Sequence, residues 1–230
     1  MPRALSLVVA TAMGIMVATG VCRSMPVKAG QSAAQPSAAE ARPKIYQPTA
    51  EQRKLGIYQP YSDGDIEFMS GMIPHHAQAV IMAGWAPSHG ARKDVAILCE
   101  RMVVAQRDEI ASMQQWLRDR GLPVPDGKST RHKMKMVMNG VEMDHEMLMP
   151  GMLTDEEMAA LDKARGREFD RLFLTGMIKH HQGAIDMVDK LFKSYGAAQS
   201  DDIFKFASDV HADQEIEIEV MKGMLAGGGG

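Results

Sequence analysis

The sequence predicts an all-α fold, a four-helix bundle that contains one helical hairpin twice. Apolar residues recur at helical spacing in four long segments beyond residue 64, and no segment is assigned to a strand. A repeated motif relates the first two of these segments to the last two. Because one hairpin cannot bury its own apolar stripe, we expect the two hairpins to pack against each other.

The expected helices begin and end at recognisable signals. Asp63 or Asp65 is the expected N-cap of the first helix, and Pro87 lies just beyond its end. Gly121 stops the second helix, and Thr154 begins a short helix with a capping box, TDEE. The expected ranges are about 65–86, 91–119, 154–164, 167–194 and 201–225.

The internal repeat is the observation that fixes this architecture. FMSGMIPHHAQAVIMA at 68–83 aligns without gaps with FLTGMIKHHQGAIDMV at 173–188, an offset of 105 residues. Each copy is followed by the pattern Q-x-x-E-I-x-x-M-x-x-x-L, which ends at Leu117 and at Leu225. The repeated unit is therefore a helical hairpin rather than a single helix.

The N-terminus is typical of an export signal. Arg3 supplies a positive charge, residues 4–21 are uncharged and mostly apolar, and 27–29 offer a small-residue cleavage site. We expect an exported protein of the bacterial periplasm, held at the membrane only if the signal stays uncleaved. The expected segments are a signal peptide at 1–29, a flexible arm at 30–64, a first hairpin at 65–120, a Met-rich loop at 121–153, a second hairpin at 154–225 and a glycine tail at 226–230.

Composition excludes several classes of function. A net charge of −3 argues against a nucleic-acid partner. Two cysteines are too few for a disulfide framework or a Cys-rich metal module, and Cys99 is expected to be a buried structural thiol. The unusual numbers are 21 methionines and 8 histidines. In an oxidising compartment, His and Met are the ligands that resist disulfide formation.

Each repeat carries the motif G-M-I-x-H-H, with a further methionine seven residues after the first histidine. Thioethers and imidazoles on one helix face suit Cu(I) or Ag(I), and imidazole also suits Cu(II). A methionine stripe also suits an irregular apolar core, so a packing role stays open for the methionines. The candidate metal ligands in the hairpins are His75, His76, His180, His181, Met72, Met82, Met177 and Met187.

Four polar residues on the partner helices are expected to support the histidines. Gln106, Glu109, Gln214 and Glu217 recur at matched positions, and they are expected to satisfy histidine N–H groups. An alternative uses both glutamates and the four histidines as ligands of a ferritin-like di-metal oxidase, although the E-x-x-H motifs of such bundles are missing.

The loop between the hairpins is the strongest local anomaly. Seven methionines occur between Met134 and Met152, and neither a helical nor a strand period is assigned to them. Exposed methionines without periodic packing predict a flexible trap for Cu(I). The alternative is a loop that packs over the bundle. The candidate ligands are Met134, Met136, Met138, Met143, His145, Met147, Met149 and Met152.

The duplicated G-M-I-x-H-H and the following Q-x-x-E-I-x-x-M resemble the bacterial domain-of-unknown-function family numbered 305, over about 65–225. This resemblance implies a ferritin-like four-helix bundle, export, and in some members copper binding and copper tolerance. It also implies that both histidine pairs match the family's paired histidines. Pro74 stands where the second copy has Lys179, so the two sites are not expected to be equal.

Together these observations predict an exported protein that binds copper, as Cu(I) in preference to Cu(II), with silver as a second ion. It would sequester the metal or hand it to a copper-transfer partner protein rather than catalyse a reaction. Two alternatives stay open: the di-metal oxidase, and a structural or interaction bundle whose methionines fill the core and have no metal role.

Overall fold

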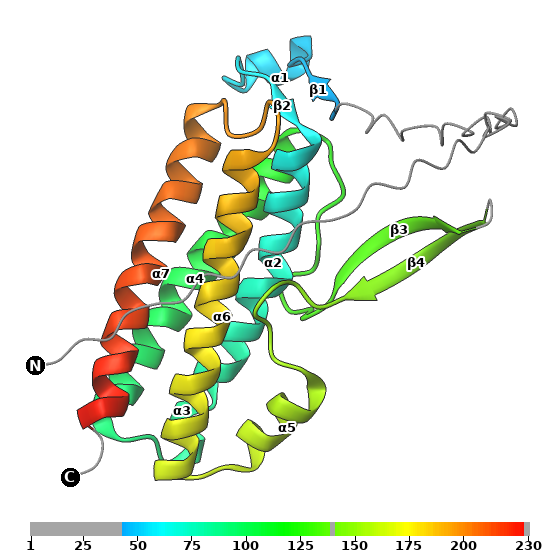
Figure 1. The fold of residues 1–230 in the computed structure, drawn as a ribbon. Coiled ribbons are helices and arrows are strands. Elements are labelled where there is room, and N and C mark those ends of the chain that lie inside the picture. Colours follow the sequence, from blue (N-terminus) through cyan, green and yellow to red (C-terminus); the bar gives the residue numbers. More distant parts are fainter. Residues whose placement is uncertain (1–42, 139–140, 228–230) are drawn as a thin grey trace, which may run out of the picture. The chain divides into compact units, whose positions relative to one another are not determined.

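The computed structural model describes residues 43–138 and 141–227, excluding the side chains of 134–145. The expected signal peptide, residues 30–42 of the arm and residues 228–230 of the tail lie outside the described residues. The elements are β1 Ile45–Tyr46, α1 Ala50–Lys54, β2 Tyr61–Ser62, α2 Asp63–Gly84, α3 Ala86–His89, α4 Lys93–Asp119, β3 His132–Met138, β4 Val141–Met147, α5 Asp155–Lys163, α6 Arg167–Lys193 and α7 Asp201–Gly227 (Figure 1). The all-α class is thus confirmed, with only two small two-stranded sheets in the described part.

The four long helices pair in the order that the repeat predicts. α2 packs against α4, α6 packs against α7, and α2 also contacts α6, which joins the two hairpins (Figure 1). Their bounds lie within two residues of the expected ranges. The ferritin-like bundle topology implied by the family resemblance stays a prediction.

The apolar core consists of two clusters, one toward each end of the long helices. The first is built around Phe68, Trp116 and Val188, and the second around Phe169 and Phe173. Each cluster takes one half of α2 and the opposite half of α4, because the two helices of a hairpin run antiparallel. On α2 and α6 the repeated histidines fall near the point where one cluster ends and the other begins, so a polar layer lies at their junction.

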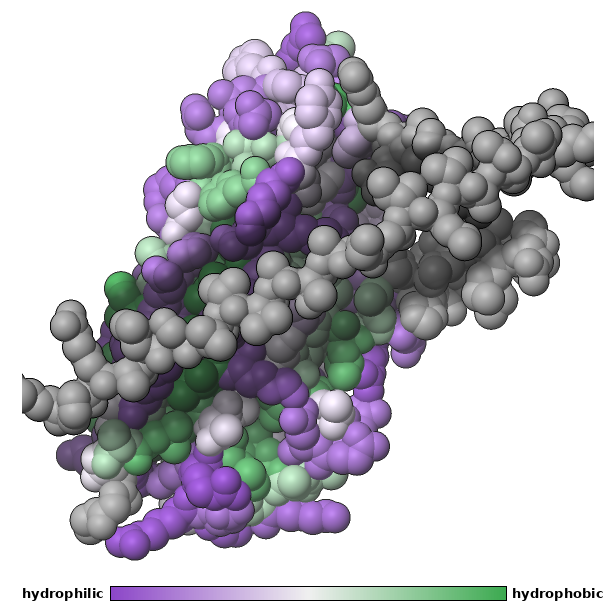
Figure 2. Space-filling view, in the orientation of Figure 1, coloured by the Kyte–Doolittle hydropathy of each residue, from purple (hydrophilic) through white to green (hydrophobic). Residues whose placement is uncertain are grey.

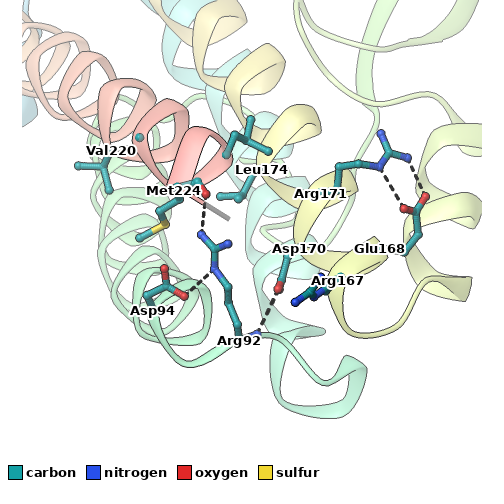
Figure 3. Close-up of a pocket in the computed structure, with 12 residues that line it drawn as sticks. Arg92, Asp94, Arg167, Glu168, Asp170, Arg171, Leu174, Val220 and Met224 are labelled. Atoms are coloured by element: carbon teal, nitrogen blue, oxygen red, sulfur yellow. Dashed lines mark hydrogen bonds and ion pairs between the residues drawn. The ribbon is translucent and has the colours of Figure 1, made fainter. Parts of the chain in front are cut away.

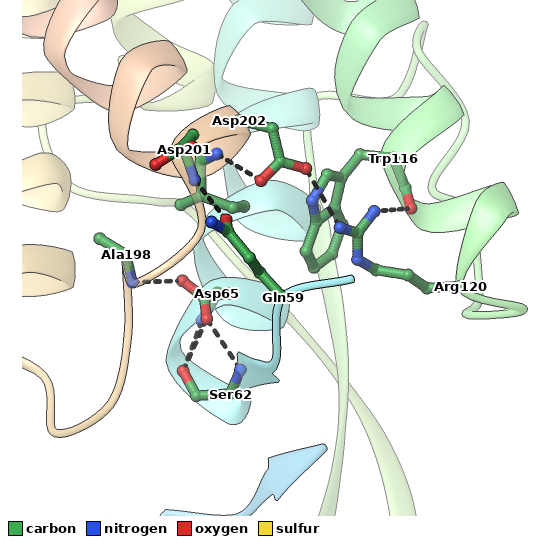
Figure 4. A network of polar contacts seen from close by, with 9 residues as sticks. Gln59, Ser62, Asp65, Trp116, Arg120, Ala198, Asp201 and Asp202 are labelled. Carbon is green, nitrogen blue, oxygen red and sulfur yellow. Dashed lines mark hydrogen bonds and ion pairs between the residues drawn. The ribbon is translucent and has the colours of Figure 1, made fainter. Parts of the chain in front are cut away.

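Capping and polar contacts fix one end of the helices. Ser62, not Asp63 or Asp65, is the N-cap of α2, and Asp65 completes the capping box from inside the helix. The other carboxylate oxygen of Asp65 accepts a hydrogen bond of 2.7 Å from the Ala198 backbone N–H (Figure 4). Asp65 therefore ties the α6–α7 turn to the start of α2, and holds Ala198 at a φ of 52°.

A second contact closes the same end. The Arg120 guanidinium lies 3.9 Å from the Trp116 ring centroid and donates a hydrogen bond of 3.1 Å to Asp202 (Figure 4). It therefore joins the end of α4 to the start of α7. Burial is the largest influence on this guanidinium and lowers its pKa from the ordinary value.

Part of the expected flexible arm has short elements of its own. β1 pairs with β2, the Tyr46 and Tyr61 rings stack, and Gln52 of α1 donates a hydrogen bond of 3.3 Å to the Arg120 carbonyl. Two-residue strands are too short to show a sequence period, so composition alone made this segment resemble a linker.

The assignment of the Met-rich segment to an irregular loop is wrong. β3 and β4 form an antiparallel hairpin in which Met136 pairs with Met143, and Lys133 with Glu146. Its period of two is visible once methionine is counted as apolar, because Met134, Met136 and Met138 alternate with other residues. The connecting dipeptide, Asn-Gly, is also the strongest signal for a two-residue hairpin turn.

The surface of the described part is mixed in polarity. On the visible face, hydrophobic residues are interrupted by hydrophilic ones rather than forming one continuous apolar area (Figure 2). Among residues 43–138 and 141–227, no helix combines the length and the apolar character needed to cross a bilayer.

Candidate metal centre

The repeated histidines form a buried layer between the two apolar clusters. His75 and His76 come from α2, His180 and His181 come from α6, and all four side chains are 0% exposed. Adjacent residues on a helix point about 100° apart, so each pair divides between two directions. One histidine of each pair faces the other hairpin, and its neighbour faces the partner helix of its own hairpin.

The inner histidines meet at the contact between α2 and α6. The ring centroids of His75 and His180 lie 3.8 Å apart. His75 Nε2 lies 3.0 Å from the Pro150 carbonyl oxygen, which accepts a hydrogen bond from the Nε2–H group. Neither ring nitrogen of His180 makes a well-aligned hydrogen bond within the protein, although the His75 backbone carbonyl lies close enough to influence its pKa. Equivalent residues of the two repeats therefore have unequal surroundings.

The outer histidines each meet a glutamate of the partner helix. His181 Nε2 lies 2.6 Å from Glu217 Oε2, and His76 Nε2 lies 2.8 Å from Glu109 Oε2. The first contact is a well-aligned hydrogen bond, whereas the second is close but too poorly angled to count as one. Both glutamates are partly exposed, so these pairs connect the buried layer to the surface of α4 and α7.

The two glutamines of the repeat lie one turn before these glutamates and are buried. The side-chain oxygens of Gln106 and Gln214 have no hydrogen-bond partner in the protein. Nearby, burial and then the charges of Glu109 and Glu217 raise the pKa of Asp213. The polar layer therefore holds several unsatisfied acceptors beside a carboxylate-rich surface.

Burial keeps the inner imidazoles neutral. Removal from water, reinforced by the neighbouring His76, lowers the pKa of His75 to about 3. Burial, followed by the influence of His75 and His181, lowers the pKa of His180 well below its ordinary value. A neutral imidazole has one unprotonated nitrogen, which is the form that binds metal ions.

The four hairpin methionines are all part of the apolar core. Met72 and Met187 belong to the cluster around Phe68, while Met82 and Met177 belong to the cluster around Phe169. They flank the histidine layer on both sides. Packing explains their burial, and their sulfur atoms are the soft donors nearest in sequence to the histidines.

The end of the linker between the hairpins crosses the histidine layer. Met149 is partly buried, Met152 is buried, and the Met149 backbone N–H donates to the Met152 sulfur over 3.2 Å. Met147 is 38% exposed, and the side chains of the other five candidate ligands lie outside the described residues, so only their strand register is known. These are Met134, Met136, Met138, Met143 and His145.

Residues 43–133 and 146–227, whose side chains are described, contain no cluster of three or more His, Cys, Asp or Glu residues suited to a metal ion. A site built from these residue types alone is therefore not present there. Cys99 is buried, and burial followed by the charge of Asp170 raises the pKa of its thiol to about 12. The donors that remain for a soft metal are imidazoles combined with thioethers.

Sequence reasoning missed two residues that shape this layer. The Pro150 carbonyl contacts His75, and the Gln78 side chain exchanges two hydrogen bonds with the Leu153 backbone. A backbone carbonyl leaves no signal in sequence. Gln78 did offer one, because it is a polar residue within an apolar stretch two residues after the histidine pair.

A cavity of about 1100 Å³ lies away from the histidine layer, among the starts of α4 and α6 and the end of α7 (Figure 3). Its lining includes no candidate ligand. Arg92 donates to Asp94 and to the Met224 carbonyl, each over 2.8 Å, and Arg171 pairs with Glu168 (Figure 3). These contacts fasten the end of α7 to the start of α4.

The fold and the histidine layer define a class: mostly helical proteins with two related hairpins that bury paired histidines between apolar clusters. The chain belongs to the DUF305 family, described as a domain of unknown function, whose model matches residues 65–225. The resemblance found in the sequence is thus confirmed. No curated protein matches the chain significantly.

Solved structures of this family are similar to the chain. A DUF305 protein from Streptomyces coelicolor, assigned as a secreted protein, is 24% identical with a TM-score of 0.58, over 71% of this chain and 92% of that one. This identity supports the fold alone. CopM in its Cu(I)-bound form is 26% identical with a TM-score of 0.53, over 72% of this chain and 98% of CopM. CopM structures also include Ag-bound, Cu(II)-bound and apo forms.

Proposed function

We propose that this protein is an exported copper-binding protein that holds Cu(I), and Ag(I) in its place. It would sequester the ion or pass it to a copper-transfer partner, which would support metal tolerance, and it would not catalyse a reaction. One observation carries the proposal. His180 is fully buried beside His75, and neither of its ring nitrogens makes a well-aligned hydrogen bond.

Burying imidazole nitrogens without hydrogen bonds lowers the stability of the folded protein, unless a ligand binds them. Each buried polar atom without a hydrogen bond costs about 1–3 kcal/mol. A metal ion that accepts the His180 lone pair would offset part of that cost. The same layer keeps its inner imidazoles neutral, so no proton has to be displaced first.

The available donors favour soft ions. Thioethers prefer Cu(I) and Ag(I), while imidazole also accepts Cu(II). The similarity to CopM, which has been crystallised with Cu(I), Cu(II) and Ag, supports this choice of metal. Export is supported by the apolar, singly charged N-terminus, and a bacterial periplasm is the compartment that we propose.

Metal analysis of the purified exported protein tests the proposal. The protein is loaded anaerobically with Cu(I) against a competing chelator, then dialysed, and its copper is counted. We expect retention by the wild type and a loss in the double variant His180→Ala and His181→Ala. The matched control is His211→Ala, because His211 is a partly exposed histidine of α7 that lies outside the buried layer. A wild-type protein that retains neither copper nor silver would overturn the proposal.

A second variant isolates the hairpin. Lys133 and Glu146 are partners in the β3–β4 ladder, so a two-residue Asn-Gly turn can join them directly in place of 134–145. This change removes Met134, Met136, Met138, Met143 and His145, and keeps the linker segment that packs on the helices. We expect the shortened protein to fold and to hold fewer Cu(I) ions. An unchanged copper count would remove the hairpin from the set of ligands.

A further inference from the structure

A small cavity lies where the β3–β4 hairpin joins the helices. Its volume is about 180 Å³, and it is bounded by α2, α6 and the open end of the hairpin, where His132 pairs with Met147. Four of its lining residues carry soft or borderline donors: His132, Met147, Met149 and Met187. His132 begins β3 and Met147 ends β4, so the hairpin brings together residues that are 15 positions apart in sequence.

Pro74 explains how His132 is held. In an α-helix the N–H of residue 74 would donate to the carbonyl of residue 70, but proline has no N–H. The Ser70 carbonyl is thereby released, and His132 makes a hydrogen bond to the Ser70 backbone. A carbonyl can only accept, so the histidine nitrogen that contacts it carries the proton.

The other nitrogen of His132 is consequently a free donor to a metal ion. The side chain is 7% exposed, and its Nδ1 has no hydrogen-bond partner. In the neutral tautomer that donates to Ser70, Nδ1 is unprotonated. This is the same arrangement by which metal-binding histidines are fixed in proteins, with one nitrogen anchored and the other on the metal.

Gly71 makes room for two of the thioethers. A Cβ atom placed on Gly71 would lie 2.7 Å from Met149 Cε and 3.6 Å from Met187 Cε. The ends of these two side chains therefore converge over the same turn of α2. Met147 is 38% exposed, whereas Met187 is 6% exposed, so the cavity runs from solvent into the core.

The acidic groups in the lining already have partners. Glu67 accepts a hydrogen bond of 2.6 Å from Lys190, and Asp186 accepts one of 3.2 Å from Gln182. Hard cations such as Mg²⁺ or Ca²⁺ need several free oxygen ligands. The uncommitted donors here are sulfur and imidazole nitrogen, which select Cu(I) or Ag(I).

We propose that this cavity binds one Cu(I) or Ag(I) ion, at a site separate from the histidine layer. The donors are His132 Nδ1 and the sulfur atoms of Met147, Met149 and Met187. The inference rests on the proposed function and assigns it a second location. The second repeat has no counterpart, because Lys179 replaces Pro74 and its N–H can keep the helix bond.

Carbon-13 labelling of the methionine methyl groups tests the site by nuclear magnetic resonance during titration with Ag(I), with Cu(I) competition measured in parallel. We expect the methyl signals of Met147, Met149 and Met187 to shift within the first equivalents. In the double variant Met149→Leu and Met187→Leu, one ion per chain is lost, or its affinity falls at least tenfold. The control is Met113→Leu with Met221→Leu, two fully buried methionines outside the cavity, which should bind as the wild type does.

The outcomes separate the two proposals. If the wild type binds neither ion, the proposed function fails. If the wild type binds and the cavity variant matches the control in count and affinity, this site is wrong while the proposed function stands. Should the double variant unfold, Met147→Leu carries the test, because that side chain is partly exposed and outside the core. Unchanged affinity in Met147→Leu, together with an unshifted Met147 methyl signal in the wild type, would then overturn the site.

Discussion

Gln78 and Gly183 occupy equivalent positions in the two repeats, and both contact the segment that links the hairpins. Gln78 accepts a hydrogen bond of 2.7 Å from the Leu153 N–H and donates one of 3.0 Å to its carbonyl. Gly183 leaves room for the linker because it has no side chain, and a Cβ there would collide with the Pro150 carbonyl. The two residues thus hold the linker against the histidine layer.

Gly183→Ala should displace the linker. The added methyl group has no space beside Pro150, so we expect the free energy of unfolding to fall by about 1–3 kcal/mol, as for other overpacked sites. Urea unfolding measures this. Gly223→Ala in α7 is the control, since nothing lies near its Cβ and alanine favours a helix by up to about 1 kcal/mol. Equal stability of the two variants would contradict the close contact.

Gln78→Leu should leave the Leu153 backbone unpaired. The two lost hydrogen bonds involve buried groups, each worth about 1–3 kcal/mol when unsatisfied. Urea unfolding should show this loss, and hydrogen exchange should show a faster Leu153 amide. Gln182→Leu, at an exposed position of α6, should change stability by less than about 0.5 kcal/mol. A protected Leu153 amide in Gln78→Leu would refute the assignment.

His180→Leu should separate stability from metal binding. Because neither nitrogen of His180 makes a well-aligned hydrogen bond, an apolar replacement removes a desolvation cost without breaking such a bond. We expect the metal-free variant to be as stable as the wild type or about 1 kcal/mol more stable at pH 7, while its copper count falls. His75→Leu is the comparison. It breaks the bond to Pro150, so it should destabilise by about 1–3 kcal/mol. Greater loss in His180→Leu than in His75→Leu would contradict this account.

The metal-free protein should lose stability in mild acid. His75 has a pKa of about 3 when folded and an ordinary pKa of 6.5 when unfolded. Between these values the unfolded chain binds a proton that the folded chain does not, so the stability is complete above pH 6.5 and declines toward pH 3. Each such histidine contributes up to about 1.4 kcal/mol per pH unit.

Replacing one of these histidines measures its contribution to the pH dependence of the free energy of unfolding. Unfolding of the wild type and of His180→Leu between pH 4 and 7 compares the two slopes, and the carboxylates common to both proteins cancel. Since the pKa of His180 is also lowered by burial, the variant should show the shallower slope. Identical slopes would mean that His180 is protonated equally in both states.

Cys99 should be unreactive in the folded protein. Its pKa of about 12 leaves roughly 1 thiol in 10,000 ionised at pH 8, and the side chain is 1% exposed. A chromogenic disulfide reagent should therefore label it only in denaturant. Cys99→Ala should keep the wild-type copper count, because the thiol is buried in the apolar cluster around Phe169 and belongs to neither proposed set of donors. Fast labelling of the native protein would disprove its burial.

The helices could be predicted because the signals that define each helix lie within or beside its own residues. Apolar spacing, capping boxes such as Thr154 with Glu157, and stop signals are local, so α2, α4, α6 and α7 follow from the sequence. The β3–β4 hairpin was equally local. Its alternation appears only when methionine is counted as an apolar residue of a strand, as at Met134, Met136 and Met138.

The geometry of the candidate site depends on contacts that no local pattern encodes. The Gln78 bonds to Leu153 span 75 positions, and His132 reaches a carbonyl that Pro74 releases in another element. Because the paired histidines are adjacent on a helix, their side chains must point in two different directions. Their spacing does not identify which histidine meets its counterpart and which meets a glutamate, because that choice is made by helix packing.

The linker offers the Pro150 carbonyl to one inner histidine and not to the other, and this breaks the equivalence of the repeats. Pro150 engages His75 Nε2, whereas His180 keeps both nitrogens uncommitted. An ion that arrives between them therefore meets one ring whose tautomer Pro150 already sets, with Nδ1 free, and one ring whose tautomer is still open. The two halves of the chain, which share one motif, thus present differently prepared imidazoles to the same ion.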